Sequence, residues 1–571
     1  MKLVFFQPTL FLGPIFFCAQ LASAQTPDAG ALQQGIQRQL DAGQMQAPPE
    51  SFIKEKAPTP APASKNQTLI DVKSFKVTGM TLVSQAEAQE VLIPFNNRKL
   101  TLAQINEAAT AISDIYQKKG RIAQAVVPPQ DIKDGIVEIK IIEGRVGAII
   151  IEPAFEEDPP RLTSKTTTKF LSYFNPEGGL VDLDGLERSL SLINEIPGVR
   201  AEVGLEPGKD DGSTDIRIKV DELSRFSGRV DLTNYGSAST GTGQAILNLG
   251  LNDLMGIGDA GTIDVIGSAG SIFGLARYYI PASADGLRVG IGGSTLSYNT
   301  LASYSTTTTT GTANTGGFYA NYALQRTARA NKTINLSLEN KSYFNYSNGI
   351  EISNYTINSA TLGVVGNQFI GDASWIWSAN ATYGNLNINN TSQLISDQNG
   401  AATTGGYGKA TIYSAFNQPL PIKKTNLLLS FNGQLANKNL NSAEQLYLGG
   451  PYAVRAYPVT QGGGSQGAIA SAELNHTYQN DLKLGVFFDA GVIQQYKYVY
   501  EGWQGQTNAG NSYPLYATGL NASYAYKKSE VSAIVAYRVG NNPLYNQSGQ
   551  QVNVNGYYQA VQLWVKGSLY F

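Results

Sequence analysis

Apolar and polar residues alternate along most of the second half of the chain. From Leu223 to Phe571 the pattern has the period of a strand with one apolar face and one polar face. The last segment shows the pattern well. Val561, Leu563, Val565, Leu569 and Phe571 fall on one face, and Gln562, Trp564, Lys566, Ser568 and Tyr570 fall on the other.

The same alternation recurs upstream, and it predicts a closed sheet. Leu427, Leu429, Phe431 and Leu435 alternate with mostly polar neighbours, as do Leu247, Leu249 and Leu251. Lipid cannot satisfy the backbone groups of an open edge, so a sheet that spans a membrane must close. The span 223–571 holds about sixteen strands at roughly 22 residues for each strand with its connection. We therefore predict a transmembrane antiparallel β-barrel. A soluble β-sandwich, the alternative, does not explain polar second faces in a chain with an export signal.

The first 24 residues are predicted to be a secretory signal peptide. Lys2 precedes an apolar run that ends at Leu21, and small residues follow up to Ala24. This order matches a cleavable leader with its cleavage site at Ala24. Cleavage would remove Cys18, the single cysteine, and leave a mature chain without thiols or disulfides.

A helix and a linker are predicted to follow the leader. Within residues 25–45, Leu32, Ile36 and Leu40 recur every fourth position and form one narrow apolar stripe. A stripe this narrow does not stabilise an isolated helix. The helix must therefore dock against another part of the protein. The polar lumen of a barrel would suit it as a plug, and a disordered leader is the open alternative. Residues 46–68 contain five prolines and are predicted to be an extended linker.

Two related small domains are predicted between the linker and the barrel, at 69–144 and 145–222. Each is expected to contain a strand, two helices and two further strands. Leu102, Ile105, Ala109 and Ile112 repeat the spacing of Leu183, Leu186, Leu190 and Ile193, with an offset of 183 − 102 = 81 residues. Thr101 with Gln104 forms a capping box at the start of one helix.

A loop arginine and a strand aspartate are the candidate functional pair. Arg455 is the one formal charge in the Gly- and Tyr-rich stretch 449–458. Its guanidinium keeps its proton and seeks a carboxylate where water is scarce. Asp489 lies on a later alternating strand, on the same face as Phe487, and this face would line the lumen of a barrel. If the loop folds inward, the two charges can meet.

These residues resemble a known group of proteins. Val454-Arg455-Ala456-Tyr457, with Phe487 and Asp489, is similar to the tetrad and the Phe-x-Asp of outer-membrane translocators and barrel-assembly proteins. Ala456 stands where the group usually has Gly. The paired small domains resemble polypeptide-transport-associated (POTRA) domains, on the residues 127–132, Gly135, 142–145, 196–199 and 206–208. With the leader helix, nearly the whole mature chain resembles the two-partner secretion transporters of the TpsB, or haemolysin-secretion, type.

The resemblance implies a location, a function and partners. It places the barrel in the outer membrane of a Gram-negative bacterium and the POTRA domains in the periplasm. It implies export of one large exoprotein, a haemolysin or adhesin, without ATP, with Arg455 and Asp489 as a loop-to-barrel latch. The barrel-assembly machinery and outer-membrane lipid would be further partners, and Phe571 would act as the assembly signal. A barrel-assembly factor and a passive porin are the alternatives.

Composition and the remaining motifs do not favour an enzyme. The net charge of −2 and a pI near 5.8 give no support to nucleic-acid binding. Gly463–Gly467 matches a G-x-S-x-G elbow, but it lacks the strand–turn–helix setting, and His476 is the only histidine. Gly256–Gly261 matches a dinucleotide fingerprint, but a strand is expected to follow it. We expect no catalytic residues, no cofactor and no metal.

Overall fold

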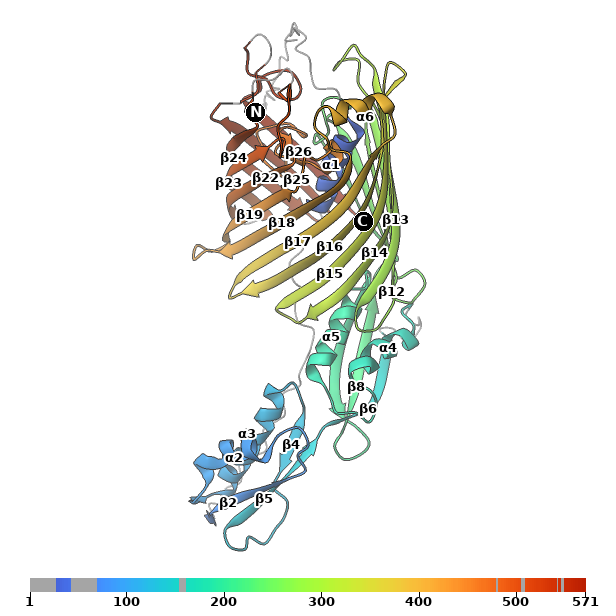
Figure 1. The fold of residues 1–571 in the computed structure, drawn as a ribbon. Helices are drawn as coiled ribbons and strands as arrows, with labels where there is room; N and C mark the ends of the chain where they lie inside the picture. Colours follow the sequence, from blue (N-terminus) through green and yellow to red (C-terminus); the bar gives the residue numbers. More distant parts are fainter. Residues whose placement is uncertain are drawn as a thin grey trace, which may run out of the picture.

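A large barrel and two small domains make up the molecule (Figure 1). The computed structural model describes residues 27–42, 69–153, 161–478, 481–504, 509–541, 543–545 and 549–571. The predicted signal peptide with its Ala24 cleavage site and the proline-rich linker 46–68 lie outside these residues. No helix within these ranges is long and apolar enough to cross a membrane.

The barrel is a closed antiparallel sheet of sixteen strands, which confirms the predicted fold. Every neighbouring pair is consecutive along the chain except β19–β22, where the long loop with β20 and β21 intervenes, and β26–β9, which closes the barrel. The strands are β9 (Phe226–Thr233), β10 (Gln244–Asn252), β11 (Ala260–Ser268), β12 (Ser271–Pro281), β13 (Leu287–Asn299), β14 (Thr309–Arg326), β15 (Ala330–Ser347), β16 (Ile350–Ile370), β17 (Ala373–Ile388), β18 (Gly405–Pro419), β19 (Thr425–Ala436), β22 (Gln466–Thr477), β23 (Leu482–Gln494), β24 (Ser512–Tyr526), β25 (Ser529–Val539) and β26 (Val561–Tyr570).

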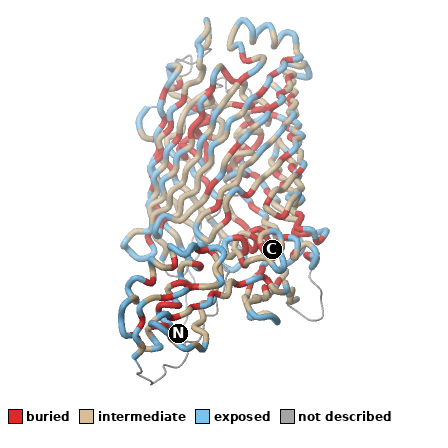
Figure 2. The backbone as a smooth tube through the Cα atoms, turned by 60° about the horizontal axis from the view of Figure 1, so that its bottom comes forward, coloured by how far each residue is buried: buried red, intermediate tan, exposed pale blue. Residues whose placement is uncertain are grey.

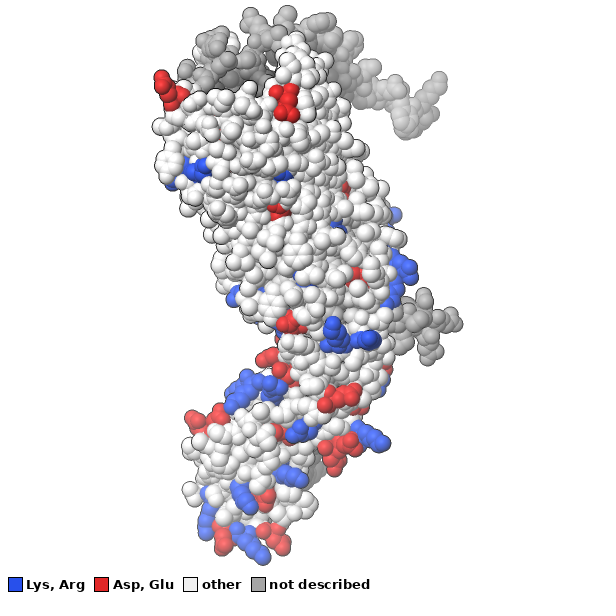
Figure 3. All heavy atoms as spheres, turned by 45° about the vertical axis from the view of Figure 1, so that its right-hand side comes forward, with Lys and Arg blue, Asp and Glu red and all other residues white. Residues whose placement is uncertain are grey.

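The alternation of the sequence becomes two faces of one wall. On β23, Val486 and Phe488 are exposed on the outside, whereas Phe487 and Asp489 are buried on the inside. Buried and exposed positions are interspersed along the other barrel strands as well (Figure 2). Charged side chains gather on the two small domains and at the adjoining end of the barrel, while the visible barrel wall carries few (Figure 3). A wall of this kind suits contact with lipid.

The first small domain packs two helices on a three-stranded sheet of order β2-β5-β4. Its elements are β1 (Ile70–Val72), β2 (Ser74–Thr78), α2 (Gln85–Leu92), η1 (Ile93–Phe95), β3 (Arg98–Leu100), α3 (Leu102–Lys118), β4 (Ala123–Val126) and β5 (Ile136–Glu143). The predicted capping box is present, because Thr101 accepts from the Gln104 backbone and Gln104 reaches back to Thr101. The short pair β1–β3 and the turn η1 were not predicted; they add to the simple order of strand, two helices and two strands.

The second small domain has the predicted order without additions. Its elements are β6 (Arg145–Pro153), α4 (Ser164–Phe174), α5 (Leu183–Asn194), β7 (Val199–Pro207) and β8 (Ser213–Glu222), in a sheet of order β6-β8-β7. Leu186, Leu190 and Ile193 on α5 are buried in the core of this domain. The helical spacing read from the sequence therefore marks the buried face of α5.

This second domain is joined to the barrel by several direct contacts. Arg326 at the end of β14 pairs with Glu195, just after α5. Arg188 on α5 donates to the Asp285 carbonyl at 2.8 Å, and the Thr163 N–H donates to the Gly256 carbonyl at 3.0 Å. The stretch Gly256–Gly261 is thus the turn from β10 into β11 and not a nucleotide-binding loop.

Candidate functional site: the barrel lumen

A long loop between β19 and β22 folds into the barrel. It contains η2 (Ser442–Glu444), β20 (Leu446–Tyr447) and β21 (Gly463–Gly464). Most of its middle part is buried, including Leu446, Tyr447, Leu448, Ala453, Val454, Ala456 and Tyr457. A loop on the surface would be exposed, so this one is a structural part of the lumen.

Arg455 and Asp489 meet inside the barrel in a bidentate pair. The Arg455 Nε–Asp489 Oδ2 distance is 3.0 Å, and the Nη2–Oδ1 distance is 2.8 Å. The backbone N–H of Arg455 also donates to Asp489 Oδ2, at 3.1 Å. Asp489 is fully buried and Arg455 is 7% exposed. A fork-to-fork pair of this kind fixes direction as well as distance.

The arginine has further partners that were not predicted. Its Nη1 donates to Glu473 Oε2 at 2.7 Å and its Nη2 to Ser471 Oγ at 3.1 Å. The guanidinium also lies 3.4 Å above the centre of the Phe487 ring. Glu473 and Ser471 lie on β22, where Ser471 pairs in register with Asp489. Both alternate along β22 with residues of the outer face, and the register that brings them to Arg455 was not readable from the sequence.

The rest of the tetrad is also held in place. Val454, Ala456 and Tyr457 are buried. The Arg455 carbonyl accepts from Trp564 Nε1 on β26 at 2.7 Å. Ala456 is not among the non-glycine residues with positive φ, so its backbone does not need the glycine that is usual at this position.

Arg538 on β25 is a second buried arginine that was not predicted. Its guanidinium lies 4.4 Å from the centre of the Tyr457 ring and 5.0 Å from that of Tyr558. The stacking holds the last residue of the tetrad against β25, which lies two strands along the sheet from β23, the strand that carries Asp489.

The predicted helix, α1 (Ala29–Ala42), lies inside the barrel (Figure 1). Leu32, Ile36 and Leu40 are buried in one cluster with residues of the barrel wall. The wall also binds the polar face of the helix, since Gln33 Nε2 donates to Thr315 Oγ1 at 3.1 Å and to Ser294 Oγ at 3.3 Å. The amphipathic stripe therefore docks in the lumen, as the plug hypothesis requires.

The start of the inward loop forms the seat of this helix. Gln34 Nε2 donates to the Ala443 carbonyl at 2.5 Å, and Asp28 accepts from Ser442 Oγ. Gly30 packs closely on Ala443, because a Cβ added to Gly30 would lie 2.7 Å from the Ala443 Cβ. We call residues 441–444 the plug seat.

The plug seat is itself fixed to the wall by a buried carboxylate. Glu444 is 2% exposed and lies between two lysines. Its Oε2 is 2.6 Å from Lys409 Nζ on β18, and its Oε1 is 3.1 Å from Lys341 Nζ on β15. Glu339 on β15 also pairs with Lys341, at 3.2 Å. None of these residues was predicted.

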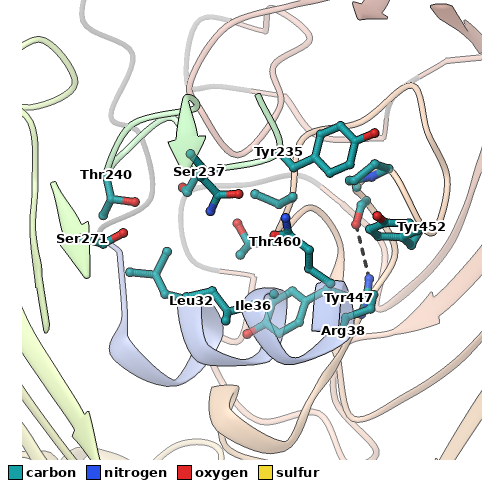
Figure 4. A pocket seen from close by; sticks show the side chains of 18 of the residues that line it. Leu32, Ile36, Arg38, Tyr235, Ser237, Thr240, Ser271, Tyr447, Tyr452 and Thr460 are labelled. Atoms are coloured by element: carbon teal, nitrogen blue, oxygen red, sulfur yellow. Dashed lines mark hydrogen bonds between the residues drawn. The ribbon is translucent and has the colours of Figure 1, made fainter. Parts of the chain in front are cut away.

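A pocket lies where the helix faces the loop (Figure 4). A cavity of about 40 Å³ lies between Leu32 and Ile36 of the helix and Tyr447 and Tyr452 of the loop. Arg38 crosses its edge and donates to the Gly449 carbonyl at 3.3 Å. The helix and the loop therefore contact each other beside this cavity.

The serine and histidine of the apparent elbow lie far apart. Ser465 is buried just before β22, where its Oγ donates to the Gln495 carbonyl and accepts from the Leu440 N–H. His476 is near the other end of β22 and pairs with Thr425 Oγ1 at 2.8 Å. Ten residues of extended strand, at about 3.3 Å each, lie between the two.

Comparison with known proteins decides the family. The family model described as haemolysin secretion/activation protein ShlB/FhaC/HecB matches residues 212–515. That is more than half of the chain. The protein belongs to this family. A second model, the ShlB-type POTRA domain, matches residues 70–144.

Members of this family are two-partner secretion transporters of the outer membrane, with POTRA domains in the periplasm. The heme/hemopexin transporter protein HuxB of Haemophilus influenzae is 26% identical over 493 residues, which is 82% of this chain and 84% of the relative. The outer membrane transporter CdiB of Dickeya dadantii is 25% identical over 518 residues, 85% of this chain and 88% of the relative.

A solved structure agrees on the fold. The structure of CdiB from Escherichia coli matches with a TM-score of 0.72 at 19% identity, over 96% of this chain and all of that one. At this identity the match speaks for the fold alone. The family therefore places the end of the barrel that carries the POTRA domains at the periplasm, and the opposite end at the cell surface.

Proposed function

We propose that this transporter exports one large, unfolded exoprotein of the haemolysin or adhesin type, and that α1 and the inward loop close its pore at rest. One observation carries the proposal: α1 and the inward loop lie together in the lumen, where Leu32, Ile36 and Leu40 join one buried cluster with residues of the barrel wall and with Ala443 of the loop. The class of cargo is supported by two relatives. One is described as a hemolysin transporter protein and the other as a heme/hemopexin transporter protein. Export would need both elements to move.

The two glycines of the plug helix provide a matched test of closure. Gly30→Ala should raise the single-channel conductance in planar bilayers, because the new Cβ would lie 2.7 Å from the Ala443 Cβ and the Tyr355 Oη. Gly35→Ala makes the same chemical change where no atom lies within 4 Å, so conductance should stay at the wild-type level or fall. Replacing glycine with alanine also favours the helix by about 1 kcal/mol at either position. Helix propensity therefore cannot explain a difference in conductance between the two variants.

Deleting residues 28–44 sets the upper limit of this test. The deletion should give a folded barrel with heat-modifiable mobility and a conductance at least as high as that of Gly30→Ala. If the deletion leaves conductance unchanged, α1 does not close the pore and the proposal for the plug is wrong.

Capture of the cargo is proposed to occur on the POTRA sheets by strand addition. In each domain the central strand, β5 or β8, is paired on both sides. Within the described residues the outer strands have one edge without a partner strand, except that the start of β6 bonds residues 178–180. Such an edge offers backbone hydrogen bonds to any extended chain. On β2 the Phe75 carbonyl accepts from the Gln89 side chain at 2.9 Å, a bond that an added strand could replace.

Hydrogen exchange on the full-length transporter tests strand addition. Adding the unfolded N-terminal segment of the exoprotein should slow exchange along one outer strand, with no change on the faces of α2 to α5. A protection pattern confined to the helices, or none at all, would speak against strand addition. The same segment with several prolines inserted is the matched control, because proline lacks the N–H that a strand must donate.

Further partners are part of the proposal. Phe571 would be read by the barrel-assembly machinery; its backbone pairs with Gly228 in both directions, at 3.0 and 3.2 Å, and its side chain is 54% exposed on the outer wall. The exposed apolar faces of the strands would contact outer-membrane lipid.

The proposal gives the chain no catalytic step, cofactor or metal. Folding of the cargo outside the cell would make its transport run outward. A role in inserting other barrels is the alternative, and loss of the protein would then lower the levels of unrelated barrels.

A further inference from the structure

Three asparagines lie in register on the outer wall of the barrel. Asn340 on β15 pairs with Asn358 on β16, and Asn358 pairs with Asn385 on β17. A glycine continues the row at each end, Gly316 on β14 and Gly406 on β18. We call these three asparagines the amide row. Its members are exposed.

Alternation shows that the amide row faces outward. On β15, Leu336 and Leu338 are exposed apolar residues on the same face as Asn340. The side chains on either side of Asn340 face the lumen, where the Glu339 carboxylate pairs with Lys341, and Lys341 pairs with Glu444 of the inward loop, so Glu339 can border the outer wall only with the rest of the residue. The amide row therefore belongs to the wall that meets the membrane.

The row also marks a boundary along the barrel. The next row toward the periplasm is largely apolar and contains Phe318, Leu338, Ala360 and Tyr383. The next row toward the cell surface is polar and contains Asn314, Ser342, Thr356 and Asn387. Tyr383 is 68% exposed, as expected of an aromatic residue at a membrane interface. The β15–β16 turn is at the end opposite the POTRA domains, so the boundary is that of the outer leaflet (Figure 1).

The wall is hollowed at this point. A shallow depression of about 530 Å³ is lined by the amide row together with Gly316, Ala360 and Tyr383. A Cβ on Gly316 would have no atom within 4 Å, so the floor is open there. The Tyr383 hydroxyl lies 3.1 Å from where a Cβ of Gly406 would stand, so the ring leans toward the row.

The chemistry of the depression is neutral and rich in hydrogen-bonding groups. Asn340 Nδ2 donates to Asn358 Oδ1 at 2.8 Å. Each side-chain amide has two N–H donors and an oxygen that can accept twice. A single hydrogen bond between two of the amides therefore leaves most donors and acceptors of the three side chains available to a ligand. Glu339, which also borders the depression, is occupied by Lys341 and by the Tyr319 hydroxyl at 3.0 Å. Lysine and arginine, which a phosphate would favour, are not among its lining residues.

We propose that the amide row binds the sugar headgroup of an outer-leaflet glycolipid. Paired amide donors and acceptors match the vicinal hydroxyls of a sugar ring, and an aromatic ring matches its apolar C–H face. The depression begins where the apolar, lipid-facing wall ends, so a lipid whose acyl chains lie on Leu338 and Phe318 would bring its headgroup to the asparagines. Binding of a glycolipid at this site requires only that the barrel lies in the outer membrane. It does not depend on the proposals for the plug and the cargo.

Native mass spectrometry of the full-length transporter in detergent tests the site. The probe is a rough-type lipopolysaccharide, with phosphatidylglycerol as the comparison lipid. The triple variant Asn340→Ala, Asn358→Ala and Asn385→Ala should bind the lipopolysaccharide at least tenfold more weakly and phosphatidylglycerol unchanged. Asn358→Gln, which keeps an amide, should lose less than the triple variant.

Asn335→Ala is the matched control, because Asn335 lies on the opposite face of β15. It should bind both lipids like the wild type, and heat-modifiable mobility should show that every variant is folded. Equal lipopolysaccharide affinity of wild type and triple variant would overturn the proposal. So would an equal loss for both lipids, or a change of oligomeric state in the triple variant without a change in lipid binding.

Discussion

Replacing Arg455 with alanine is expected to stop secretion while the barrel still inserts and closes. The change would leave Asp489 fully buried and Glu473 partly buried, both without their cationic partner. Removing one partner of a buried ion pair typically costs about 3–5 kcal/mol. The barrel keeps its strand pairs, so the cost falls on the loop, which would leave its place in the lumen. Secretion of the exoprotein and heat-modifiable mobility are the two measurements.

A double-mutant cycle separates the latch from two independent defects. If Arg455 and Asp489 act as one pair, Arg455→Ala with Asp489→Ala should be hardly worse than either change alone. Additive losses would contradict the latch. Arg455→Lys should restore little, because an ammonium cannot bind Asp489 through two parallel bonds and reach Glu473 as well.

Arg217 supplies the control for charge loss as such. It also pairs with two carboxylates, Glu152 and Glu206, but these pairs lie on the surface of the second POTRA domain. Arg217→Ala should leave secretion and mobility unchanged. The contrast would show that burial, and not the number of ion pairs, gives Arg455 its role.

Most of what could be predicted about the fold came from the local periodicity of apolar and polar residues. Alternation is a property of neighbouring residues, so it revealed the two faces of the terminal strand and placed Asp489 with Phe487 on one side. The same holds for the helices of the POTRA domains, whose buried residues follow the 3.6-residue repeat. The resemblance added what periodicity could not, namely that the loop carrying Arg455 folds inward.

The unpredicted residues share a different property. Glu473, Glu444, Lys341, Lys409 and Arg538 contact residues that are distant in the sequence or lie on other strands. Which lumen-facing side chains meet depends on the shear of the barrel and on the path of a loop without regular structure. Neither is encoded in a local pattern. Register between strands decided that Ser471 faces Asp489, and a shift by one residue would have turned one of the two outward.

Replacing Glu444 with glutamine is expected to open the channel. Glutamine keeps the shape but cannot balance Lys341 and Lys409, whose side chains are 16% and 13% exposed. The plug seat at residues 441–444 would lose its hold on β15 and β18, and α1 rests on that seat. Single-channel conductance should therefore rise toward that of the transporter lacking residues 28–44. Glu339→Gln is the matched control, since Glu339 also pairs with Lys341 but makes no bond to the loop among the described contacts.

The deletion of α1 tells whether Glu444 acts through the plug. In a transporter without residues 28–44, Glu444→Gln should add little to the conductance, because the element that its loss releases is already gone. Arg455→Ala should still impair secretion in that background, since its partners Asp489 and Glu473 lie on β23 and β22 and not on the seat. If Glu444→Gln raises conductance by the same factor with and without α1, the carboxylate holds the loop alone. The inward loop would then have two anchors on different strands, but the plug would not depend on either of them.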